Sequence, residues 1–172
     1  FLDYSIFKKV YQKLVSNFKT NFGILGSFQK DIGPFQRFSF GGTDSDELNT
    51  LLLGDHISMR GYEDGSLTPK DGNLNYKGGV IFQKFVFELK YPFIESNLLH
   101  LSMHAFFESG NCWSKYKNFN IFNLKGSLGF GFRAFIGLIL NSVISIDFGC
   151  PLSQLGKQNS FIPQFSFGFG NR

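Results

Sequence analysis

The sequence predicts an all-β protein, part of a transmembrane antiparallel β-barrel. The first observation is that bulky apolar residues alternate with small or polar ones in six segments of the 172 residues. Since successive side chains of a strand point to opposite faces, each segment would turn an apolar face to lipid and a polar face to a lumen. The second observation is length, because most segments approach the roughly 9–11 residues that span a bilayer. The third is that no apolar run reaches the roughly 20 residues of a membrane helix.

The composition fits this fold class. The chain is 42% hydrophobic, and its 24 phenylalanines and 20 glycines suit strands with an apolar outer face and close backbone approach on the inner one. The net charge of +4 indicates a mildly basic surface. No lysine and arginine cluster is dense enough to predict a nucleic-acid partner.

Residues 14–28 form the first strand candidate, with phenylalanines on one parity and residues such as Lys19 and Asn21 on the other. The pattern before it is ambiguous, because apolar residues within 4–18 also recur at the spacing of an amphipathic helix. We expect a strand, a hairpin near Lys8–Lys13 and a second strand, with the helix as the alternative.

In four more strand candidates, bulky apolar residues alternate with small, polar or charged residues. These candidates are residues 80–91, 97–109, 124–135 and 140–149. The links 92–96 and 136–139 are short, whereas the links 110–123 and 150–159 are longer. Short turns at one end and longer loops at the other are typical of outer-membrane barrels.

The sixth candidate is the C-terminal stretch, where four phenylalanines share one parity with Pro163. They are Phe161, Phe165, Phe167 and Phe169. The other parity carries serine, glutamine and glycine, with Ile162 as the exception. Because proline cannot donate a hydrogen bond to a neighbouring strand, we expect this strand to lie at a sheet edge.

A long loop, residues 29–79, separates the first candidate from the second and is rich in glycine and proline. Loops longer than about 12–15 residues are usually functional or disordered. This one contains phenylalanines, leucines, Met59 and Tyr62, which makes it too apolar for a disordered linker. We therefore expect it to fold back into the lumen.

Arg60 lies in this loop and offers a planar guanidinium with five donors. Glu88 and Glu108 stand on the polar parity of the two strands that follow. Arg60 reaching between them would bind the loop tip to the wall with charge-assisted hydrogen bonds, and Gly61 would permit a sharp turn. Spacing alone leaves an alternative, in which Arg60 is solvated and both glutamates merely line a wet pore.

Several motifs follow one another in a distinctive order. The loop carries Pro34-Phe35-Gln36-Arg37-Phe38, Gly41-Gly42 and Arg60-Gly61-Tyr62. The next two strands carry Phe87-Glu88-Leu89-Lys90-Tyr91-Pro92 and Phe106-Phe107-Glu108-Ser109-Gly110-Asn111-Cys112-Trp113. A glycine-rich stretch, 126–133, and the phenylalanine-rich end complete the series. From about residue 14 onward, this order resembles the C-terminal barrel of BamA-type outer-membrane assembly factors, the bacterial surface antigen family.

The resemblance implies that residues 1–172 supply the C-terminal part, about seven strands, of a sixteen-stranded barrel whose long loop enters the lumen. Arg60, Gly61 and Tyr62 would be the loop motif, and Glu88 and Glu108 the luminal partners of Arg60. The last strand, with Phe161, Phe165, Phe167 and Phe169, would belong to a lateral seam.

The function implied by the resemblance is assembly and insertion of β-barrel proteins in the bacterial outer membrane. The implied partners are nascent outer-membrane β-barrel proteins, accessory subunits of an assembly complex and outer-membrane lipid. The alternatives are a secretion or translocation barrel of the same superfamily and a passive outer-membrane channel.

The residues predict no enzyme, metal or cofactor. No nucleophile and base pair is visible, and His100 and His104 would lie roughly 13 Å apart on a strand, too far to share one metal simply. Cys112 and Cys150 lack metal-ligand spacing, and whether they pair stays open.

The ends of the chain also bear on its extent. The first residue is Phe1, not methionine, and the chain ends on Asn171-Arg172, where the family usually has an aromatic residue. We therefore expect a piece of a longer protein.

Overall fold

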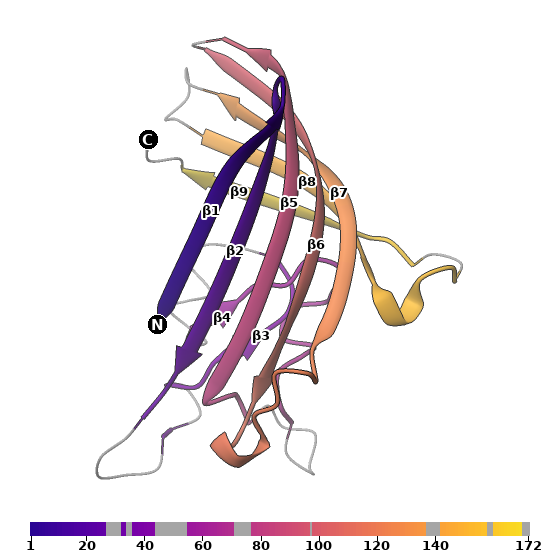
Figure 1. The fold of residues 1–172 in the computed structure, drawn as a ribbon. Helices are drawn as coiled ribbons and strands as arrows, with labels where there is room; N and C mark the ends of the chain where they lie inside the picture. The colour runs from indigo at the N-terminus through magenta and orange to yellow at the C-terminus, as the bar shows by residue number, and fades with distance from the viewer. Residues whose placement is uncertain are drawn as a thin grey trace.

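The computed structural model describes residues 1–26, 32–33, 36–43, 55–70, 77–96, 98–136, 142–157 and 160–169, with the backbone alone for 167–169. Seven antiparallel strands form one sheet in the order β1-β2-β5-β6-β7-β8-β9, which Figure 1 shows as a curved wall. The strands are β1 (Leu2–Tyr11), β2 (Leu14–Ile24), β5 (Ile81–Glu95), β6 (Leu99–Trp113), β7 (Lys125–Ile136), β8 (Ser142–Pro151) and β9 (Ile162–Phe169). The predicted all-β antiparallel fold is confirmed.

The remaining elements are short. Within the long loop, β3 (Ser39–Phe40) and β4 (His56–Ile57) pair in parallel, and the 3-10 helices η2 (Tyr116–Asn118) and η3 (Leu152–Gln154) lie in the links after β6 and β8. None of the helices in the described ranges is long and apolar enough to cross a membrane.

The N-terminal hairpin forms as expected, and the alternative of an amphipathic helix is wrong. β1 pairs with β2 from Leu2↔Phe22 to Tyr11↔Leu14, and the chain reverses at Gln12 and Lys13. β2 also pairs with β5 along its length. A helix over 4–18 would leave both sets of strand hydrogen bonds unmade, so tertiary pairing decides against the local helical spacing.

Three strands run at least two residues further than predicted, and one of them is β8, which continues past residue 149 to Pro151. β5 continues through Pro92 to Glu95, and β6 continues to Trp113, so residues assigned to the links 92–96 and 110–123 belong to strands. Pro92 lies beyond the last β2–β5 pair, Val15↔Lys90, and an irregularity in the β5–β6 register follows it. Its missing N–H therefore interrupts no pairing with β2.

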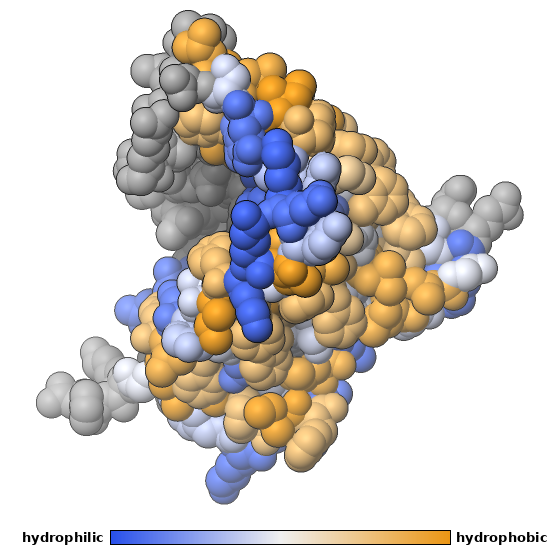
Figure 2. All heavy atoms as spheres, turned by 45° about the horizontal axis from the view of Figure 1, so that its top comes forward, coloured by the Kyte–Doolittle hydropathy of each residue, from blue (hydrophilic) through white to orange (hydrophobic). Residues whose placement is uncertain are grey.

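The two faces of the sheet differ in chemistry. One face, here the outer face, carries large apolar side chains that are 39–67% exposed: Phe18, Phe87, Tyr91, Met103, Phe107, Phe130, Phe132, Ile144 and Phe165. In Figure 2 the broad curved wall is mostly in the hydrophobic colours, and a strongly hydrophilic band crosses the end toward the viewer. The opposite, inner face carries buried polar residues, including Lys84, Glu88, His104, Glu108 and Asp147.

The described part of the long loop packs on the inner face, as the sequence predicted. Phe38, Phe40 and Met59 of the loop form a buried cluster with Phe82 of β5 and Cys112 of β6. The ring centroids of Phe38 and Phe82 are 4.8 Å apart. This cluster fixes the loop to the wall and so positions the residues after Met59.

Candidate functional site: the loop tip on the inner wall

The loop tip is residues 58–62, directly after β4. Met59 pairs with Gly42 through two backbone hydrogen bonds, so the chain leaves β4 in a fixed direction. Gly61 then turns with φ +84°, and a Cβ there would lie 2.9 Å from the backbone nitrogen of Cys150. Only glycine combines that dihedral angle with such a close approach to β8.

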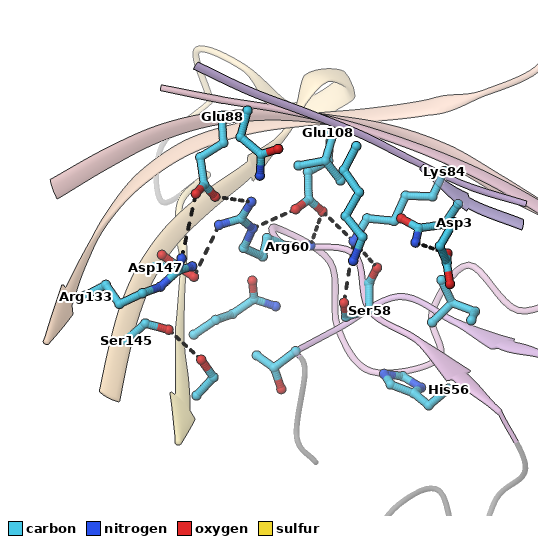
Figure 3. A pocket seen from close by; sticks show the side chains of 18 of the residues that line it. Asp3, His56, Ser58, Arg60, Lys84, Glu88, Glu108, Arg133, Ser145 and Asp147 are labelled. Atoms are coloured by element: carbon cyan, nitrogen blue, oxygen red, sulfur yellow. Dashed lines mark hydrogen bonds and ion pairs between the residues drawn. The ribbon is translucent and has the colours of Figure 1, made fainter. Parts of the chain in front are cut away.

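Arg60 lies between Glu88 of β5 and Glu108 of β6. Its Nε is 2.6 Å from Oε1 of Glu108, and its backbone N–H donates to Oε2 of the same carboxylate at 2.9 Å. Its Nη2 is 3.2 Å from Oε2 of Glu88. The side chains of Arg60 and Glu108 are 13% and 2% exposed. Figure 3 shows the guanidinium reaching from the loop toward carboxylates on the wall.

A third carboxylate, which the sequence reasoning did not assign, lies at the other end of the guanidinium. Oδ2 of Asp147 on β8 is 3.6 Å from Nη1 of Arg60. Its other oxygen, Oδ1, is 2.6 Å from Nε2 of the buried His104, which holds the carboxylate in place. The signal was available in part, because Asp147 and His104 stand on the polar parity of their strands.

Phe106 lies beneath the guanidinium, with its ring centroid 3.7 Å from Cζ of Arg60. This aromatic residue interrupts the polar parity of β6 and was not predicted to take part. A cation over an aromatic face gains roughly 0.5–2 kcal/mol, with the larger values where water is excluded.

Lys84 supplies a second buried cation and was also missed. Its Nζ donates to the carbonyl of Ser58 at 2.6 Å and lies 3.3 Å from Oε2 of Glu108. Lys84 therefore binds the loop backbone while it neutralises the oxygen of Glu108 that faces the tip.

Electrostatics hold Arg60 in its charged form. Burial disfavours the charge, but the carboxylates of Glu108, Glu88 and Asp147 outweigh it, and the pKa of Arg60 is raised above its ordinary value. The pKa of Tyr62 is raised as well, because burial disfavours the phenolate.

The loop tip also bonds to the last strand. Gln164 of β9 accepts a hydrogen bond from the N–H of Gly61 at 2.8 Å and donates one to the carbonyl of Tyr62 at 2.9 Å. The hydroxyl of Tyr62 donates to the carbonyl of Gly126 on β7 at 2.9 Å. The tip thus contacts every strand from β5 to β9.

The predicted seam residues fall in and beside β9, the last strand of the sheet order. Phe161 precedes the strand by one residue, and Phe165 is 67% exposed on the outer face. The side chains of Phe167 and Phe169 lie outside the described part of the structure.

The surroundings of the tip are open on the lumen side. A pocket of about 480 Å³ adjoins Arg60 and is lined mainly by polar side chains, among them Asn17, Lys19 and Lys90. No group of three or more His, Cys, Asp or Glu residues in the described ranges could hold a metal ion. Cys112 and Cys150 are both buried free thiols.

A curved antiparallel sheet with an apolar outer face, and an inner face ion-paired to an inserted loop, defines part of a membrane β-barrel. The model of the Omp85 superfamily domain matches residues 2–172, and the chain belongs to that superfamily. Omp85 proteins are outer-membrane associated, handle outer-membrane protein substrates and act in β-barrel insertion or in secretion and translocation, without enzymatic chemistry. No curated protein matches the chain at a significant level.

Proposed function

We propose that this chain is the C-terminal part of a sixteen-stranded, BamA-type barrel that inserts nascent β-barrel proteins into the bacterial outer membrane. The partners would be those nascent barrels, accessory subunits of an assembly complex and outer-membrane lipid. Insertion would use the exposed edge of the last strand and a lumen wall held in place by the loop, and it would need no catalytic group.

The observation that supports this proposal most directly is the pair of hydrogen bonds between Gln164 and the loop tip. Through them, the tip that Arg60 holds to β5, β6 and β8 also restrains β9. β9 has β8 as its only neighbour in the sheet described, and it contains Pro163. An edge strand of this kind is a template for an incoming strand.

The outer face makes strand addition feasible in a membrane. A strand that pairs with β9 would satisfy its backbone groups by that pairing and turn its own apolar residues to lipid, as Phe165 does. Arg60 would keep the wall behind β9 rigid while this exchange proceeds.

Photo-crosslinking in the full-length protein tests the proposal. A photoreactive phenylalanine analogue replaces Phe165 on β9, and a matched variant carries it at Phe132 on β7, which is also exposed on the outer face. Adducts with a nascent barrel protein at position 165, and few at 132, would support the seam. Equal yields at the two positions would contradict it.

Secretion or translocation of a polypeptide is the second candidate, and the polar pocket beside the tip favours it. Phe7 of β1 lines that pocket, so the same photoreactive residue there would report on the lumen. Capture of a secreted polypeptide at position 7, without capture of barrel substrates at 165, would assign the protein to secretion. A passive channel would instead keep its conductance after deletion of the long loop.

A further inference from the structure

The link between β6 and β7, residues 114–124, folds back over the outer face of the sheet; we call it the aromatic turn. The ring of Phe119 packs 4.9 Å from Trp113 and 6.2 Å from Phe22, measured between centroids. Trp113 pairs with Ile81, which has the parity of the outward Phe87, and Phe22 has the parity of Phe18. The aromatic turn lies at the lower end of β6 and β7 in Figure 1.

Hydrogen bonds fix the aromatic turn at both ends. The hydroxyl of Tyr116 donates to the carbonyl of Leu25, and the side-chain amide of Asn111 donates to the carbonyl of Asn123 at 2.7 Å. Within the turn, the N–H of Phe122 donates to the side chain of Asn120 at 2.9 Å. Its side chains are therefore presented in a defined arrangement.

This arrangement exposes large apolar groups. Phe122 is 94% exposed, and Tyr116, Ile121 and Phe119 are 37–48% exposed. Burying one phenylalanine side chain shifts an equilibrium by about tenfold or more. If Phe122 stayed in water, the protein would not obtain this free energy of burial, so the exposed ring indicates a binding surface.

The charge of the region has one sign. Lys115 and Lys117 are exposed in the turn, and Lys125 is exposed at the start of β7. No acidic residue occurs between Glu108 and Asp147. Exposed lysines beside aromatic and aliphatic side chains are the composition of surfaces that bind an anionic membrane interface.

We propose that the aromatic turn is a lipid-anchoring site. Phe122 and Ile121 seat among acyl chains, and Lys115 and Lys117 bind anionic, phosphate-bearing headgroups. Lipid is the occupant because the turn continues the outer apolar face that begins at Phe22 and Trp113, and because its lysines complement anionic headgroups. The site requires a location in the outer membrane but no assembly role, so its failure would leave the assembly proposal standing.

Lipid quenching in the full-length protein, reconstituted in vesicles, tests the site. An environment-sensitive dye is attached at Asn118→Cys in the turn, with the unsubstituted protein reporting any labelling of the buried native thiols. Vesicles contain lipids brominated along the acyl chain, with either phosphatidylglycerol or phosphatidylcholine headgroups. We expect loss of emission that is larger with phosphatidylglycerol.

Two neighbouring residues on β2 calibrate the measurement. A dye at Phe18→Cys faces outward and should be quenched, whereas one at Lys19→Cys lines the pocket and should not. Adding Phe122→Ser should lower the ratio of lipid-seated to water-exposed dye at position 118 about tenfold. Replacing Lys115 and Lys117 by glutamine should remove the difference between headgroups.

Either of two results would overturn the site. The dye at 118 could behave like the one at Lys19, or its quenching could be unaffected by Phe122→Ser. Protection from solvent that depends on protein concentration or on an added accessory subunit, with no lipid quenching, would assign the turn to a protein partner instead.

Discussion

Arg60 is held by carboxylates from three strands, and this sharing explains why the residue must be an arginine. Glu88, Glu108 and Asp147 lie around different edges of one planar group. A lysine ammonium is a compact charge that cannot reach all three in the same way. Removing one partner of a buried ion pair costs about 3–5 kcal/mol where the remaining charge is left unpaired. Here Glu108 would keep Lys84 as a partner, and Glu88 would keep Lys90 and Arg133.

Arg60→Ala should therefore destabilise the full-length barrel by up to about 3–5 kcal/mol, and Arg60→Lys should restore part of this loss. Urea unfolding in detergent micelles measures both. The control is Lys13→Ala, which breaks an ion pair with Glu95 whose side chains are about half exposed, and which should cost less than about 1 kcal/mol. Similar decreases in the free energy of unfolding for Arg60→Ala and Lys13→Ala would show that Arg60 does not fix the loop to the wall.

Gly61 and Gly156 allow a matched comparison, because both have φ +84°. A Cβ at Gly156 would meet nothing within 4 Å, whereas one at Gly61 would contact the backbone of Gly149 and Cys150. Gly156→Ala should cost only the backbone preference, about 1–2 kcal/mol. Gly61→Ala should cost clearly more and should make the loop sensitive to protease; equal costs would contradict the close approach.

At this scale the sequence predicted part of the site. Parity placed Glu88 and Glu108 on the inner face, and the structure brings both to Arg60. Asp147 and Gln164 were on the polar parity too, but only the register of β8 and β9 brings them level with the tip. That register could not be predicted from a single sequence. Phe106 was missed because it is an aromatic residue on the otherwise polar face of β6, where it was interpreted as an exception to the alternation.

At the scale of elements, the loop tip and β9 form one unit. Gln164 is 7% exposed and satisfies two backbone groups of the tip, the N–H of Gly61 and the carbonyl of Tyr62. Leaving a buried backbone group without a partner costs about 1–3 kcal/mol. The stability of β9 and the position of the loop tip therefore depend on each other through the side chain of Gln164.

Gln164→Leu should therefore loosen β9 and the loop tip together. In hydrogen exchange, amides of β8 and β9 should exchange faster, while those paired between β5 and β6 should be unchanged. Ser166→Ala is the control on the same strand and face, since within the described residues the side chain of Ser166 hydrogen-bonds to Ser145 on the neighbouring strand and not to the loop tip. Equally fast exchange in Ser166→Ala, or no acceleration of exchange in Gln164→Leu, would contradict a coupling between β9 and the loop tip through Gln164.

The elements themselves were more predictable than the site. Alternation located six of the seven strands, and the hairpin expectation supplied β1. The ends of β5 and β6 were misplaced, because the predicted links began at Pro92 and Gly110, whereas both residues lie within strands. Pro92 is tolerated beyond the β2 pairing, and Gly110 is required because a Cβ there would lie 2.7 Å from the ring of Phe40.

At the scale of the molecule, the described sheet has two unpaired edges, β1 and β9, and an apolar outer face. An edge strand offers its N–H and C=O groups to any other strand. An exposed apolar face of several strands is larger than soluble monomers tolerate. In a closed barrel within lipid, the edges would be paired and the apolar face would be covered. In this chain alone in water, the edges stay unpaired and the apolar face stays exposed.

Produced alone in buffer, the 172-residue chain should aggregate, and scattering with size-exclusion chromatography should show large particles. Detergent covers the outer face but not the edges, so micelles should reduce the particles to small discrete oligomers joined through β1 and β9. The full-length barrel should be monomeric in the same detergent, because its edges are paired. A monodisperse soluble monomer of the chain without detergent would mean that Phe87, Phe107 and Phe130 do not face lipid, and the membrane assignment of the outer face would fall with them.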